Sequence, residues 1–161
     1  RRQAAAGCAR VAATMDVRTA QLDDGPALLA MMRDFNRSEG IAWSQDTGEA
    51  ALRHLLRSPD LGLVGVATLD AVAVAYFVIC FSFDLEWSGR DAFLTELYVA
   101  PSQRGRGAGS RLLAEAERLA RGQGVRALHL AVRPENASAL RVYRTAGFAD
   151  SGRVLYSKPL A

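Results

Sequence analysis

Seven consecutive residues, Arg104 to Ser110, alternate glycine with larger residues and carry two arginines. The glycines at 105, 107 and 109 let the backbone amides of this stretch approach a ligand closely. Apolar residues at helical spacing follow from Leu112 to Ala120, so a helix begins where the loop ends. The start of a helix offers unpaired N–H groups and the positive end of the helix dipole. With the fixed charges of Arg104 and Arg106, these features predict an anion site, most naturally for phosphate groups.

The spacing of the glycines argues against two common phosphate-binding patterns. The Walker loop requires a lysine, which is absent here, and the dinucleotide fingerprint requires a third glycine where Ser110 stands. The stretch fits Arg-x-x-Gly-x-Gly, carried by Arg104, Gly107 and Gly109, and it follows an apolar strand that ends at Val99. A glycine-rich connector without a ligand is the alternative, but it does not account for the two arginines.

In this context the chain resembles the GCN5-related N-acetyltransferases (the GNAT family), in which a loop of this form holds the pyrophosphate of acetyl-CoA. Residues 136–148 resemble the last-helix motif of that family, an asparagine followed by a short helix with Leu and Tyr and then Gly-Phe. The two motifs stand in the family's order, and the resemblance extends over residues 16–159. It is closest to the diamine and polyamine acetyltransferase branch.

The resemblance implies that acetyl-CoA is the acetyl donor and that no metal takes part. It assigns cofactor binding to the loop, to the last-helix asparagine and to the backbone of the central strand, as an added strand would bind. A bulge in that strand is expected to free an N–H for the thioester oxygen. The expected cofactor-binding residues are Leu97, Tyr98, Val99, Arg104, Gly105, Arg106, Gly107, Ala108, Gly109, Ser110 and Asn136.

Hydrophobic periodicity predicts a single mixed α/β domain over residues 15–161. Strands are expected at residues 17–21, 61–69, 71–83, 94–99, 125–132 and 154–159. Helices are expected from residues 23–24 to about 40, at 47–57 with Thr47 as its cap, after the glycine loop, and at 136–146. The resemblance implies the acyl-CoA N-acyltransferase (GNAT) fold, a mixed, mostly antiparallel central sheet flanked by helices.

The net charge of +3 is explained by the first 14 residues, which hold three arginines and no acid. The remaining residues contain 17 basic and 17 acidic side chains, so no nucleic-acid surface is predicted. We expect residues 1–14 to be a disordered extension ahead of Met15, with a transit peptide as the alternative. The longest apolar run, residues 71–81, is too short to span a membrane, and without a secretory signal we expect a cytoplasmic protein.

The two cysteines and two histidines do not predict a metal site or a disulfide framework. Cys8 lies in the N-terminal stretch and Cys80 in an apolar run, while His54 and His129 are far apart. Because no histidine near Cys80 in the sequence could activate its thiol, direct transfer in a ternary complex is favoured over a covalent acyl-enzyme.

Two side chains are candidates for acid and base catalysis. In relatives the motif tyrosine lies next to the thioester sulfur, and a phenol with a pKa of about 10 is matched to a leaving thiol, so Tyr143 is the candidate general acid. The alternative for Tyr143 is a core aromatic on an amphipathic helix. Glu96 is an acid inside an apolar strand, which is costly unless the acid is partnered or used. It is a candidate general base, or else a carboxylate that orients other groups or binds the charge of the substrate.

The residues that bind the acceptor amine are the part of the site that the sequence predicts least clearly. The polyamine branch usually has two adjacent acids where this chain has Thr95 and Glu96, which weakens the prediction of a polyamine substrate. Loops that line the acceptor site in relatives could form an acidic, aromatic pocket for a cationic amine. Solvated loop residues are the alternative. The expected substrate-binding residues are Glu39, Trp43, Asp84, Glu86, Trp87 and Thr95.

The sequence therefore predicts an N-acetyltransferase that moves an acetyl group from acetyl-CoA to a primary amine, with a small-molecule amine or polyamine favoured. The alternatives are a non-catalytic acyl-CoA-binding or sensor domain of the same fold, and a protein lysine or N-terminal acetyltransferase. Because a sensor needs only the phosphate loop, the presence of Glu96, Asn136 and Tyr143 favours the enzyme. A homodimer is considered because it is common in the family, and no nucleic-acid or membrane partner is expected.

Overall fold

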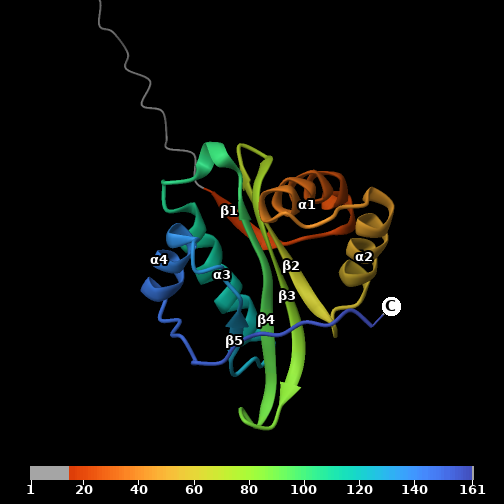
Figure 1. The fold of residues 1–161 in the computed structure, drawn as a ribbon. Helices are drawn as coiled ribbons and strands as arrows, with labels where there is room; N and C mark the ends of the chain where they lie inside the picture. Colours follow the sequence, from red (N-terminus) through yellow and green to blue (C-terminus); the bar gives the residue numbers. More distant parts are fainter. Residues whose placement is uncertain (1–14, 161) are drawn as a thin grey trace, which may run out of the picture.

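A five-stranded sheet lies between two pairs of helices in the computed structural model, which describes residues 15–160 (Figure 1). The predicted N-terminal extension, residues 1–14 with Cys8, lies outside the described residues. The strands are β1 (Asp16–Thr19), β2 (Gly62–Leu69), β3 (Val72–Asp84), β4 (Gly89–Val99) and β5 (Leu128–Leu130). The α-helices are α1 (Gly25–Glu39), α2 (Gln45–Arg57), α3 (Ala108–Gly122) and α4 (Ala137–Thr145), with short 3-10 turns at Leu22–Asp24 and Pro101–Gln103.

The strands are arranged in the order β1-β2-β3-β4-β5. Neighbouring strands are antiparallel except β4 and β5, which are parallel. The sheet is therefore mixed and mostly antiparallel, as predicted. A two-residue turn joins β2 to β3, and its residues Asp70 and Ala71 both have positive φ, which suits the twist of a tight hairpin.

Both faces of the sheet are covered, and this explains why β3 reads as a continuous apolar run. On one face, Leu112 and Leu113 of α3 pack in the same core cluster as Phe77 and Ile79. On the other face, α1 and α2 pack against the sheet in a second cluster that includes Tyr76. Figure 1 shows α3 and α4 on one side of the sheet and α1 and α2 on the other.

The bounds of several expected elements differ from the structure. The strand β4 begins at Gly89, five residues before its predicted start at residue 94. The helix α2 begins at Gln45 after Ser44, two residues before the predicted cap Thr47. The strand β5 covers only Leu128–Leu130, because its parallel pairing with β4 ends there.

The predicted closing strand at residues 154–159 is wrong, because no part of it pairs with the sheet. Val154, Leu155 and Tyr156 are 74%, 66% and 89% exposed. The side chains of this segment favour an extended backbone, but this preference is only local. A strand also needs a neighbouring strand to accept its hydrogen bonds. Among the described residues, no helix combines the length and the apolar character that crossing a membrane requires.

Candidate active site

The glycine loop leads directly into α3, as the sequence predicts. Gly105 and Gly107 adopt left-handed backbone conformations with φ of 73° and 78°, which glycine tolerates best. Gly107 is the residue that caps the start of α3. The amide of Arg111 donates to the Gly107 carbonyl at 3.1 Å, so the amides of residues 108–110 precede the first hydrogen-bonded turn. The loop thus presents free N–H groups at the positive end of the helix.

Arg104 is fixed beside this loop rather than free in solvent. Its Nε donates to the carbonyl of Val99 at 2.8 Å, and its guanidinium lies 5.7 Å from the centre of the Tyr98 ring. These contacts tie the end of β4 to the loop. The guanidinium keeps its positive charge, and its remaining N–H groups can still donate to an anion at the start of α3, where an anion is favoured.

The central strand β4 contains the predicted bulge. Val78 of β3 pairs with Glu96 and Ile79 pairs with Leu94, so Thr95 is the extra residue. Pairing of β4 with β5 also stops at Leu94. Beyond this point the edge of β4 that faces β5 has no strand partner over residues 95–99. An extended chain such as a pantetheine arm can hydrogen-bond to a free edge of this kind.

The last-helix motif lies against the same core cluster as α3. Tyr143 packs there with its ring 5.9 Å from the ring of Phe148. Burial, and secondarily the charge of Glu39, raise the pKa of Tyr143 above its ordinary value. The phenol therefore keeps its proton at neutral pH. Asn136 caps α4, since its Oδ1 accepts from the amide of Ala139 at 3.1 Å.

Glu96 projects from β4 toward the face covered by α1 and α2. The hydroxyl of Tyr76, a residue buried in that face, donates to Glu96 Oε2 at 2.6 Å. Burial raises the pKa of Glu96, while the Tyr76 hydrogen bond lowers it. Burial also raises the pKa of Tyr76, so this hydroxyl remains a donor. Glu96 is thus a half-buried carboxylate with one identified partner, next to the bulge.

The predicted acceptor residues do not form one pocket. Glu39 lies at the end of α1, where its carboxylate pairs with Nε of Arg133 at 3.2 Å. The charge of Glu39 contributes to the raised pKa of Tyr143, so Glu39 lies on the side of α1 that is toward α4. Trp43 packs beside α1 and α2 in the second core cluster. The other three residues, Asp84, Glu86 and Trp87, belong to the β3–β4 turn.

The β3–β4 turn and the end of β4 predicted to bind the cofactor are separated by most of the strand. From Gly89 to Leu97 the chain extends roughly 25 Å at about 3.3 Å per residue. In the turn, the carboxylate of Asp84 accepts from the amide of Glu86 at 2.8 Å. Glu86 pairs with Arg153 at 2.8 Å. Thr95 is exposed at the bulge, and its hydroxyl donates to the carbonyl of Val78 at 3.3 Å.

Two arginines that sequence reasoning did not single out neutralise predicted acceptor acids. Arg133, in the segment between β5 and α4, pairs with Glu39, and Arg153, after α4, pairs with Glu86. The pairs join residues far apart in the sequence, so no local pattern could have revealed them. Tyr76 was also missed, because its position in an apolar run indicated only a core residue and gave no sign of a hydrogen bond to Glu96.

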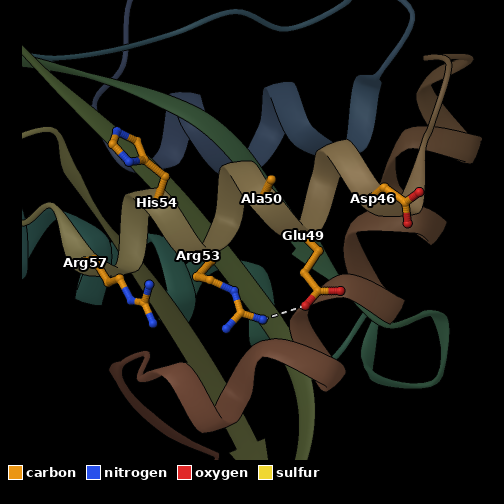
Figure 2. Close-up of a pocket in the computed structure, with 6 residues that line it drawn as sticks. All are labelled: Asp46, Glu49, Ala50, Arg53, His54 and Arg57. Carbon is orange, nitrogen blue, oxygen red and sulfur yellow. Dashed lines mark hydrogen bonds and ion pairs between the residues drawn. The ribbon is translucent and has the colours of Figure 1, made fainter.

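Six residues of α2 line a hollow on the outer surface of that helix, and Figure 2 shows the ion pair between Arg53 and Glu49 within it. Because a single helix supplies every side chain, no groups from other elements converge there. Nothing in this hollow is arranged for acyl transfer. Within residues 15–160, no group of three or more His, Cys, Asp or Glu side chains could hold a metal ion.

The free edge of β4 and the helix start that favours anions are features that suit an extended carrier with phosphate groups. Comparison with known proteins agrees. The family model described as "Acetyltransferase (GNAT) family" matches residues 28–148. Thialysine N-epsilon-acetyltransferase of Bos taurus is 29% identical over 144 residues, 83% of this chain and 84% of the relative. Aminoglycoside N(6')-acetyltransferase type 1 of Serratia marcescens is 28% identical over 116 residues, 70% of this chain and 80% of the relative.

Solved structures show the same fold. An integron cassette protein from the Cole Harbour Salt Marsh metagenome has a TM-score of 0.81 and 34% identity, and the match covers 90% of each chain. An aminoglycoside N-acetyltransferase in complex with CoA has a TM-score of 0.81 at 22% identity, covering 92% of this chain and 97% of that one. The chain belongs to the acetyltransferase (GNAT) family. It is therefore an N-acetyltransferase, a class that takes its acetyl group from acetyl-CoA.

We predict that Gly107→Asp abolishes the thermal stabilisation of the protein by acetyl-CoA. The substitution puts a carboxylate where phosphates are expected and strains a backbone with φ of 78°. For the wild type, a ligand at a hundredfold over its Kd adds about 2.7 kcal/mol, which a thermal-shift titration detects. Gly124→Asp is the matched control, because Gly124 also has a positive φ but follows the far end of α3. Equal loss of the acetyl-CoA shift in both variants would contradict the assignment of the loop.

Proposed function

We propose that this enzyme acetylates the primary amine of a small cationic molecule by direct attack on acetyl-CoA. The observation that carries this proposal is Glu96, a half-buried carboxylate beside the bulge of the central strand. An amine that must react there arrives as an ammonium ion, and a carboxylate in a partly dry site attracts it strongly. Glu96 either holds this positive charge or takes the proton of the amine.

The proposed mechanism uses the two sides of β4. The amide of Leu97, directly after the bulge and Glu96, is aimed at the thioester oxygen and stabilises the charge that develops on it. Tyr143 donates its proton to the leaving thiolate. The raised pKa of Tyr143 supports this role, because the phenol is protonated when the thiolate forms. Burial raises the pKa of the Cys80 thiol and disfavours the thiolate, which supports direct transfer over an acyl-enzyme.

The pairing of two predicted acceptor acids with arginines favours a short acceptor with few positive groups over a long polyamine. Two of the acids expected to bind a polycation, Glu39 and Glu86, are already neutralised by Arg133 and Arg153. The relatives are named for thialysine and for aminoglycosides, which are small-molecule amines. Thialysine carries a side-chain amine and an amino-acid head group, and an arginine–carboxylate pair can bind both charges of such a head group.

The acceptor is tested by measuring CoA release from acetyl-CoA with thialysine, spermidine, an aminoglycoside and a lysine-containing peptide. We expect the highest kcat/KM with thialysine or another small amine that carries few charges. Preference for spermidine would favour the polyamine reading, and preference for the peptide would favour protein acetylation. Binding of acetyl-CoA without turnover of any amine would contradict the proposed enzyme and favour a sensor.

Replacing Tyr143 by phenylalanine is predicted to lower kcat by about 10²- to 10⁴-fold, the usual contribution of a general acid. Binding of acetyl-CoA should be retained, because the substitution removes only a hydroxyl. Steady-state kinetics and an acetyl-CoA thermal shift measure the two effects separately. Tyr156→Phe is the control, since that ring is 89% exposed in the C-terminal segment. Unchanged kcat in Tyr143→Phe would remove this residue from the mechanism.

A cytoplasmic homodimer is part of the same proposal. The outer edge of β5 has no strand partner among the described residues, and apolar side chains of the segment that follows α4 are exposed. Association of two copies would cover both features. Sedimentation velocity at micromolar concentration tests the dimer, and a purely monomeric protein would contradict it.

A further inference from the structure

The ion pair between Glu39 and Arg133 joins the end of α1 to the segment that follows β5. Nε of Arg133 lies 3.2 Å from Oε2 of Glu39, and Nη2 of Arg133 donates to the main-chain carbonyl of Glu39. The parallel strands β4 and β5 last pair at Leu94 and Leu130. From this last pair, three further residues along each chain lead to Leu97 and to Arg133, so each lies within about 10 Å of it and in the same direction. The ion pair therefore lies at the end of the sheet where the thioester is proposed to bind.

The same ion pair lies on the face of the sheet to which Glu96 projects. Glu39 is the last residue of α1, and α1 packs on the face that carries Tyr76 and its hydrogen bond to Glu96. Tyr143 packs on the opposite face with α3, yet the charge of Glu39 contributes to the raised pKa of its phenol. Beyond Leu94, β4 and β5 are no longer paired, so the two faces can meet there. The ion pair is thus close to Tyr143 and on the face of Glu96.

This ion pair leaves hydrogen-bonding groups free, unlike the pair that Glu86 forms with Arg153. Arg153 donates from Nη1 and Nη2 to the two carboxylate oxygens of Glu86, at 2.8 and 3.2 Å. Among residues 15–160, Nη1 of Arg133 and Oε1 of Glu39 have no hydrogen-bond partner. The side chains of Arg133 and Glu39 are 63% and 28% exposed, so a ligand can reach both. The contact with the main-chain carbonyl holds Arg133 in place while these groups stay free.

The free groups suit a ligand that carries one negative and one positive charge side by side. Nη1 of Arg133 can donate to a carboxylate, and Oε1 of Glu39 can accept from an ammonium group. An acceptor made only of amines has no group for Arg133 and would place a positive charge beside that guanidinium. At neutral pH the head group of a free amino acid carries both charges. The ion pair therefore favours an amino-acid head group over a polyamine.

The position of Glu96 sets where the reactive amine of such a ligand would lie. Glu96 belongs to β4 and Arg133 follows β5, and neighbouring strands lie about 4.8 Å apart where they are paired. Beyond Leu94 the two strands are no longer paired, so their separation there exceeds this value. The extended arm of a lysine-like side chain spans about 6 Å from Cα to the terminal nitrogen. One small molecule can therefore place its head group on the ion pair and its side-chain amine at Glu96.

We propose that the acceptor is a free amino acid with an amine at the end of its side chain, and that Arg133 binds its carboxylate while Glu39 binds its α-ammonium group. This inference rests on the proposed function, since it concerns the acceptor of the same reaction. Arg133 and Glu39 are specificity-determining residues, because they contact the head group and not the reacting atoms. Glu96 receives the side-chain amine, which is the amine that becomes acetylated.

The test compares three forms of one acceptor by measuring CoA release from acetyl-CoA. The acceptor is whichever of ornithine, lysine and thialysine gives the highest kcat/KM. Its carboxamide lacks the negative charge of the head group, and its Nα-acetyl derivative lacks the positive charge. For the wild type we expect each derivative to lose about 10- to 100-fold in kcat/KM, the usual effect of removing a hydrogen bond between charged groups. The loss should appear mainly in KM, because the head group is bound equally in the ground and transition states.

Two variants assign each charge of the head group to its partner. Arg133→Gln should lose about 10- to 100-fold in kcat/KM with the free amino acid and far less with the carboxamide, which has no carboxylate for Arg133 to bind. Glu39→Gln should show a similar loss with the free amino acid and a far smaller one with the Nα-acetyl derivative. A purely structural role of the ion pair would instead lower activity with all three forms alike.

Arg153→Gln is the matched control, because Arg153 pairs with Glu86 in the β3–β4 turn, at the other end of β4. This variant should keep the wild-type preference for the free amino acid. An acetyl-CoA thermal shift equal to that of wild type shows that each variant is folded.

Equal kcat/KM of the wild type for the free amino acid and its carboxamide would overturn the inference and leave the proposed function intact. Turnover of other amines, with none of the three amino acids acetylated, would have the same meaning. Equal losses of Arg133→Gln with all three forms would also overturn the inference. A wild-type protein that binds acetyl-CoA and acetylates no amine would overturn the proposed function and the inference together.

Discussion

The site depends on one interruption of backbone pairing. Thr95 is an extra residue in β4, and the pairing of β4 with β5 ends one residue earlier at Leu94. Residues 95–99, from the bulge to the end of β4, therefore keep one edge without a neighbouring strand among the described residues. The bulge also turns Glu96 toward the α1 and α2 face while Leu97 faces the α3 cluster.

Burial on both faces of the sheet makes this edge rigid. β3 is covered by α3 on one face and by α1 and α2 on the other, so the strand beside the bulge cannot shift to close the gap. Arg104 adds a second constraint, since its hydrogen bond to Val99 connects the end of β4 to the glycine loop. In the proposed binding mode, one continuous piece of chain would hold both the phosphate end and the thioester end of the donor. Such preorganisation lowers the cost of binding and of charge development.

The distribution of charge distinguishes the two sides of the site. Acids that the sequence suggested for cation binding, Glu39 and Glu86, are each paired with an arginine from the C-terminal third of the chain. Asp91 is instead buried and Glu96 half-buried, and they accept from hydroxyl groups of Ser82 and Tyr76. Carboxylates shielded from solvent, with neutral donors, keep more of their influence on a nearby cation than exposed, screened pairs do. This contrast favours a short acceptor that reaches deep into the sheet.

The sequence alone determined the features that local rules govern. Alternating glycines and a change to helical period predicted the loop of Arg104 to Ser110 and the helix α3, and the continuous apolar run of β3 predicted a strand covered on both faces. Local preference failed for residues 154–159, where β-favouring side chains found no neighbouring strand. Only the tertiary structure decided that Arg133 neutralises Glu39, that Tyr76 binds Glu96 and that Asp91 meets His129. Each of these contacts joins separate elements, and its existence depends on strand order and register, which no short pattern in the sequence encodes.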